Sequence, residues 1–141
     1  MNKLLILPIT TLILVGCNKK STSSTKDFDY SDVLDLTIEW SHVLNVKSGK
    51  YYAYIYSETC SHCKEIKQDI ISYALDNYGT LYFVRYVDKI PIIDSGVPLL
   101  EKSNIEELGI VGTPSLFLIE NHIVKGYYAG SKEIVKTLTN E

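Results

Sequence analysis

The sequence predicts one α/β domain in which a mixed central sheet lies between helices on both faces. First, residues 51–56 form an unbroken run of Tyr, Ala and Ile, which is typical of a strand covered on both faces. Second, a helix-patterned segment and another apolar run at residues 81–87 follow it, which predicts a strand–helix–strand unit with parallel strands. Third, apolar runs at residues 115–119 and 123–128 flank a tight turn and predict an antiparallel hairpin.

The chain begins with a segment that has the features of an export signal. Lys3 precedes an apolar stretch at residues 4–15, which has the length of a signal-peptide core and is too short to span a bilayer comfortably. The stretch ends in Leu14-Val15-Gly16-Cys17, which resembles the lipobox of bacterial lipoproteins. That resemblance implies cleavage before Cys17 and lipidation of its thiol. The alternative is an ordinary signal peptide, or a plain anchor that happens to contain a cysteine.

These features divide the chain into three parts. Residues 1–16 are expected to be the lipoprotein signal peptide, residues 17–30 the lipidated cysteine with a flexible Ser/Thr-rich tether, and residues 31–141 the folded domain. Two or more acyl chains on Cys17 would hold the protein stably on a membrane. The expected location is therefore the extracytoplasmic face of a cell membrane, through a lipid anchor.

Caps and apolar spacing predict the remaining elements. Large apolar residues at helical spacing predict a short helix over residues 36–44, capped by Thr37. A longer helix carries the apolar face of residues 63–75. A pattern typical of a capping box predicts a short helix over residues 103–108, and Ser131 is expected to cap a final helix.

The chemistry is expected at Cys60-Ser61-His62-Cys63, where the buried strand leads into the long helix. Two cysteines three residues apart on a first helical turn lie on one face, close enough to form a disulfide. Cys60 also lies near unpaired backbone N–H groups and the positive end of the helix dipole, which favour a thiolate. We therefore expect Cys60 to be the attacking nucleophile, with a pKa below that of a free thiol, and Cys63 to be the resolving thiol.

The order of these motifs resembles that of the thioredoxin family over most of the chain, from about residue 36 to residue 138. The resemblance implies a thioredoxin-like three-layer sandwich and an activity on protein disulfides that needs no cofactor. It also implies that Pro114 follows a cis peptide bond and packs beside the disulfide. The backbone of Thr113 would then pair with an incoming peptide strand by β-addition.

Two residues bear on the direction and rate of such chemistry. Ser61-His62 resembles the Pro-His dipeptide of the periplasmic disulfide-oxidase branch, and an imidazole that donates a hydrogen bond to the Cys60 thiolate would make the disulfide more oxidising. The alternative is that His62 is a solvated helix residue. Tyr54 occupies the position where relatives carry a buried acid that helps to deprotonate the second thiol, and Glu58 or Lys64 is the candidate substitute.

The sequence therefore predicts a monomeric, membrane-anchored thiol–disulfide oxidoreductase that acts on protein thiols and disulfides with a membrane redox partner. The 14 basic residues against 17 acidic ones, with no basic patch, argue against nucleic acid. A zinc site with His62 or His122 is disfavoured, because structural zinc takes four ligands and the chain holds one Cys-x-x-Cys pair. A non-catalytic docking module for protein or peptide export is the second alternative.

Overall fold

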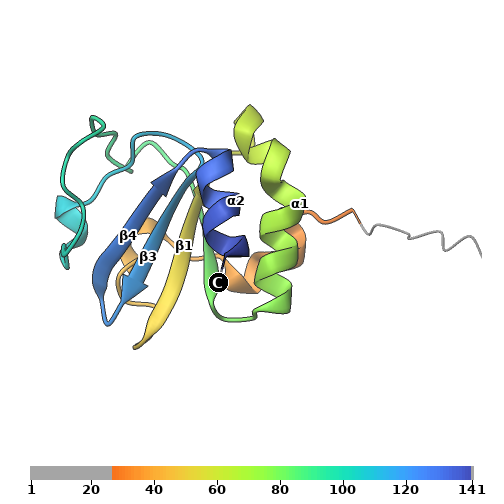
Figure 1. The fold of residues 1–141 in the computed structure, drawn as a ribbon, viewed down its shortest axis with the longest axis horizontal. Coiled ribbons are helices and arrows are strands. Elements are labelled where there is room, and N and C mark those ends of the chain that lie inside the picture. The colour runs from red at the N-terminus through yellow and green to blue at the C-terminus, as the bar shows by residue number, and fades with distance from the viewer. Residues whose placement is uncertain (1–26, 141) are drawn as a thin grey trace, which may run out of the picture.

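The computed structural model describes residues 27–140, so that the predicted signal peptide, Cys17 and most of the tether lie outside the described residues. Within this range no helix is both long enough and apolar enough to cross a membrane. Figure 1 shows a sheet with two α-helices packed on one side of it. The strands are β1 (Lys50–Tyr56), β2 (Leu81–Arg85), β3 (Ser115–Glu120) and β4 (Ile123–Ala129). The helices are α1 (Ser61–Asp76), α2 (Ser131–Thr139) and the 3-10 helices η1 (Tyr30–Leu36), η2 (Trp40–His42) and η3 (Ile105–Glu107).

The sheet has the order β2-β1-β3-β4. β1 pairs with β2 in parallel and with β3 antiparallel, and Tyr54 lies opposite Phe83 on one side and Leu116 on the other. β3 and β4 form an antiparallel hairpin. The predicted strand–helix–strand unit and the hairpin are both confirmed. β1 is buried at every position after Lys50, because it lies in the middle of the sheet and both of its faces are covered.

Alternate residues of β1 face two separate apolar clusters. One face carries Tyr52, Tyr54 and Tyr56 and packs against α1, α2 and η1. The other face carries Tyr51, Ala53 and Ile55 and is covered by η2, η3 and the long connection between β2 and β3. The chain thus has an α/β thioredoxin-like fold, as predicted, with one layer of α-helices and one layer of 3-10 turns and loops (Figure 1).

The predicted helix over residues 36–44 is wrong. Thr37 ends η1, forms an isolated parallel bridge with Phe83, and is followed by Ile38, whose N–H donates to the Phe83 carbonyl at 2.8 Å. β2 is an edge strand, and this extended segment supplies hydrogen-bond partners to its outer side. Two β-branched residues in a row suit that extended conformation better than a helix, so only Trp40–His42 turns.

Residues just before residue 31 also pack on the domain. The Gln68 side-chain amide accepts from the Phe28 N–H and donates to the Phe28 carbonyl, each at 2.8 Å. Asp29 caps η1 through a reciprocal pair with Asp32, so the helix begins at Tyr30. Residues that composition assigned to the tether therefore belong to the domain, because a distant glutamine supplies their backbone partners.

Two other helix starts differ from the prediction by one residue. η3 is capped by Asn104, whose side chain accepts from the Glu106 N–H, and the capping position before α2 is Gly130. Gly130 has a φ of 89°, in the region that favours glycine, and so turns the chain sharply from β4 into α2.

Candidate active site

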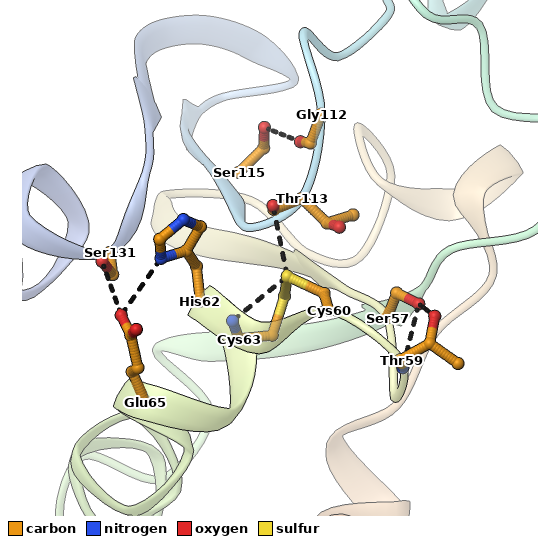
Figure 2. Close-up of a disulfide and its surroundings, with 10 residues drawn as sticks. All are labelled: Ser57, Thr59, Cys60, His62, Cys63, Glu65, Gly112, Thr113, Ser115 and Ser131. Atoms are coloured by element: carbon orange, nitrogen blue, oxygen red, sulfur yellow. Dashed lines mark hydrogen bonds and ion pairs between the residues drawn. A yellow bond between two sulfur atoms is a disulfide. The ribbon is translucent and has the colours of Figure 1, made fainter.

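The centre of the site is a disulfide between Cys60 and Cys63, whose Cα atoms are 5.3 Å apart (Figure 2). Cys60 ends the loop after β1 and has the extended backbone of an N-cap residue, and Cys63 lies in the first turn of α1. The side chain of Cys63 is only 1% exposed, whereas Cys60 is half-buried. The disulfide therefore presents the sulfur of Cys60 to an incoming reactant.

The start of α1 stabilises negative charge on this outer sulfur. The Cys63 N–H donates to Cys60 Sγ at 3.1 Å, in the manner of a helix cap. The 16 residues of α1 align their peptide dipoles behind this position, and the first turn of this fully described helix has no acidic side chain. Both features lower the energy of a thiolate at Cys60 relative to its thiol.

A loop from a distant part of the chain faces the same sulfur. The Thr113 carbonyl oxygen lies 3.3 Å from Cys60 Sγ, although 53 residues separate the two in sequence. The Thr113–Pro114 peptide bond is cis, as the resemblance implies. The structure thus brings together Cys60, Cys63, Thr113 and Pro114, and Figure 2 shows Thr113 directly opposite the disulfide.

Two side chains that the sequence did not point to, those of Ser115 and Tyr127, hold this loop in place. Ser115, which is fully buried, donates through its hydroxyl to the Gly112 carbonyl at 2.7 Å. Because that uses the serine proton, the Tyr127 hydroxyl must donate to Ser115 Oγ, 2.8 Å away. The Tyr127 oxygen in turn accepts from the Val111 N–H at 2.8 Å. A serine that opens an otherwise apolar strand directly after a proline was the available signal.

His62 lies on the rim of the site, and its side chain is 65% exposed. Its Nδ1 is 3.1 Å from Glu65 Oε2, one turn along α1. Ser131, at the start of α2, donates to the same carboxylate oxygen at 3.5 Å. Figure 2 shows the imidazole turned toward Glu65, while the sulfur of Cys60 contacts Cys63 and Thr113. The predicted hydrogen bond from His62 concerns the thiolate state, and it stays a prediction.

Tyr54 lies in the core beneath α1 and is fully buried. Within residues 27–140 neither its hydroxyl nor that of Tyr30 has a hydrogen bond of good geometry, although the two hydroxyls interact with each other. Burial raises the pKa of Tyr54, and the nearby Tyr30 raises it further; burial also raises the pKa of Tyr30 to about 12. Both phenols are therefore neutral at physiological pH, and Tyr54 cannot accept a proton from Cys63 as a carboxylate would.

The proposed substitutes for a buried acid are placed elsewhere. The Glu58 carboxylate lies 3.4 Å from Arg85 Nε, in an exposed pair at the edge of the sheet. Arg85 is thus a paired charge at the edge of the sheet. Lys64 lines a surface hollow with both of them. None of the three is part of the buried cluster that surrounds Cys63.

The histidines do not extend the cysteine pair into a metal site. Among residues 27–140 there is no group of three or more His, Cys, Asp or Glu side chains that could hold a metal ion. His122 lies in the turn after β3, at the opposite end of that strand from Pro114, and its Nδ1 is 2.8 Å from the Leu44 carbonyl. The six residues of β3 separate the two ends by about 20 Å, so His122 cannot share a ligand with the cysteines.

Known proteins resemble this chain in structure more than in sequence. No family model matches the chain, and no curated protein matches it. Among solved structures, a crystal structure of thioredoxin f2 from Chlamydomonas reinhardtii superimposes with a TM-score of 0.48 and 16% identity, over 74% of this chain and 93% of its own. The strand order, the cysteine pair at the start of α1 and the adjacent cis-proline loop give this site the features of a thiol–disulfide redox centre.

Proposed function

We propose that the protein is a membrane-anchored, extracytoplasmic thiol–disulfide oxidoreductase that acts on protein substrates. One observation carries the redox part of the proposal, whereas the anchor rests on the lipobox-like sequence that ends at Cys17. A half-buried Cys60 sulfur is bonded to a buried Cys63 at the start of α1, and the Thr113 carbonyl lies against the outer sulfur. A disulfide that served only to stabilise the fold would have no need for one accessible sulfur at a helix N-terminus.

The reaction proceeds through exchange of sulfur–sulfur bonds. In the reducing direction, the Cys60 thiolate attacks a substrate disulfide, forms a mixed disulfide and releases one substrate thiolate, which takes up a proton. Cys63, once deprotonated, then attacks the sulfur of Cys60 and releases the second substrate thiolate. Two electrons pass from the protein dithiol to the substrate, and the disulfide seen here is the oxidised product. The oxidising direction is the reverse of these steps.

The cis-proline loop supports a protein substrate rather than a small thiol. Thr113 offers backbone groups next to the reactive sulfur, where an extended peptide can pair as an added strand. The hydrogen bonds from Ser115 and Tyr127 hold that loop before substrate arrives, which reduces the entropy lost on binding.

Tyr54 affects the step in which Cys63 acts. Cys63 is buried, and the neutral Tyr54 phenol gives it no base, so its deprotonation draws on solvent that must reach the site during the reaction. A mixed disulfide on Cys60 should therefore persist longer than it would beside a carboxylate. The direction of net electron flow depends on a partner: a dithiol donor for a reductase, or a disulfide-bearing acceptor for an oxidase or isomerase. A hydrogen bond from His62 to the Cys60 thiolate would favour the second, and it would require the ring to leave Glu65.

Variants of the two cysteines test the proposal. Cys63→Ala should trap substrates on Cys60 as mixed disulfides, which dithiothreitol releases and mass spectrometry names. Wild type should accelerate insulin reduction by dithiothreitol, and Cys60→Ser should remove that acceleration. Equal rates for wild type and Cys60→Ser would instead indicate a docking module.

The anchor is tested separately. Wild type should partition with membranes and take up labelled lipid, and Cys17→Ser should do neither. If wild type carries no lipid, the proposed anchor is rejected and the redox proposal is not affected.

A further inference from the structure

The contacts of Glu65 single it out among the charged residues around the disulfide. One of its oxygens, Oε2, contacts both His62 Nδ1 at 3.1 Å and Ser131 Oγ at 3.5 Å. It therefore links the active-site dipeptide on α1 with the first residue of α2. Figure 2 shows the three side chains converging beside the disulfide, with the imidazole directed to the carboxylate.

The surroundings of His62 contain few other charges. A hollow next to it is lined by the turn from β4 into α2 and by Lys132 and Glu133, which carry opposite charges. Neither of these has a hydrogen bond or ion pair to the imidazole, so within the described residues Glu65 is the charged group that directly contacts it.

We propose that Glu65 is a positioning residue that sets the redox poise of the Cys60–Cys63 pair through His62. The inference rests on the proposed function only in taking this pair as the reactive centre. The carboxylate holds the ring by Nδ1 toward α2. The ring is thereby kept from stabilising a Cys60 thiolate, and the dithiol form is less favoured than His62 alone would make it.

Removing the carboxylate should make the disulfide more oxidising. In the equilibrium of protein dithiol and glutathione disulfide with protein disulfide and two glutathione thiols, atoms and electrons balance and no other reactant is needed. The constant for protein disulfide formation should fall roughly two- to fivefold in Glu65→Gln, the range expected for one exposed charge pair. The constant should fall further in Glu65→Ala, because this variant also removes the hydrogen bond.

A double-mutant cycle tests whether Glu65 acts through His62. The glutathione constant is measured for wild type, Glu65→Gln, His62→Ala and the double variant, with circular dichroism to verify folding. Glu65→Gln should have no effect in the His62→Ala background. Glu133→Gln is the matched control, since it removes the same charge from a residue that lines the hollow beside His62 without bonding to the ring, and it should leave the constant within about 1.3-fold of wild type.

Several outcomes overturn the proposal. They are an unchanged constant in Glu65→Gln, a shift of the same size in Glu133→Gln, or a shift that survives in the His62→Ala background. The measurement does not require catalysis of a protein substrate. The protein could equilibrate with glutathione and give the expected double-mutant result, yet fail to reduce insulin. That outcome would support the role of Glu65 and reject the proposed function.

Discussion

The two faces of the sheet use tyrosine in different ways. On the face covered by loops and 3-10 turns, Tyr51 donates to the Val43 carbonyl at 2.9 Å, and Tyr127 is bonded to the cis-proline loop. On the face covered by α1 and α2, the hydroxyls of Tyr30 and Tyr54 are buried without a hydrogen bond of good geometry among the described residues. Helices satisfy their own backbone groups, whereas irregular segments leave carbonyls and N–H groups that need side-chain partners. The hydroxyls of Tyr51 and Tyr127 thus hold loops in place on one face, whereas Tyr30 and Tyr54 act mainly as apolar side chains on the other.

The largest effect is expected where a hydroxyl fastens a buried loop. Tyr51→Phe removes the donor to the Val43 carbonyl and leaves that buried acceptor unpaired. The free energy of unfolding should fall by about 2 kcal/mol. Urea unfolding followed by circular dichroism measures it. A fall below about 0.5 kcal/mol would show that the loop-covered face does not depend on this bond.

A somewhat smaller effect is expected at the active-site loop. Tyr127→Phe removes the bonds to Ser115 and Val111 and should lower the free energy of unfolding by about 1.5 kcal/mol. Because the loop is then less ordered before binding, KM for a protein disulfide should rise roughly threefold. The glutathione constant should hardly change, since the hydrogen bonds of Cys60 and Cys63 at the start of α1 are not affected. A shift in that constant with an unaltered KM would contradict a role in substrate positioning.

On the helical face the sign should reverse. Tyr54→Phe removes a buried hydroxyl that has no hydrogen bond of good geometry, so the free energy of unfolding should rise by about 1 kcal/mol. The insulin-reduction rate should stay unchanged, because the neutral phenol transfers no proton. Thermal and urea unfolding beside Tyr51→Phe give the direct comparison. Destabilisation by Tyr54→Phe would mean that both faces use their hydroxyls alike.

The last effect is confined to alkaline solution and is absent at neutral pH. Burial raises the pKa of Tyr30 from about 10 to about 12, so between these values the unfolded chain loses a proton that the folded one retains. Stability is therefore fully present below pH 10 and falls as pH rises toward 12. Thermal unfolding across this range should show a shallower decline for Tyr30→Phe than for wild type. Identical slopes would indicate that Tyr30 ionises as freely in the fold as outside it.

The sequence was sufficient to predict the elements whose pattern is local. The unbroken apolar run of β1, the helix of Cys63 and the hairpin of β3 and β4 all have the predicted type and order. The close approach of Cys60 and Thr113 followed from the family resemblance, because nothing local joins residues 53 positions apart.

The errors lie where a distant partner determines the conformation. Thr37 and Ile38 are extended because Phe83 on the edge strand bonds to them, and Phe28 is ordered because Gln68 holds it. The role of Tyr127 was hidden for the same reason, since a tyrosine in a strand gives no sign of which loop its hydroxyl will reach. Long-range hydrogen bonds have no periodicity for a pattern to show.

The Gln68 clamp on Phe28 fixes the point at which the N-terminal segment leaves the domain. Gln68 lies eight residues beyond Cys60, which is about 12 Å along the axis of α1. The eleven residues from Cys17 to Phe28 span at most ~40 Å when fully extended. A lipid on Cys17 would therefore confine the disulfide to a layer roughly 50 Å deep above the bilayer, so that the substrates within reach are those secreted past, or embedded in, that same surface.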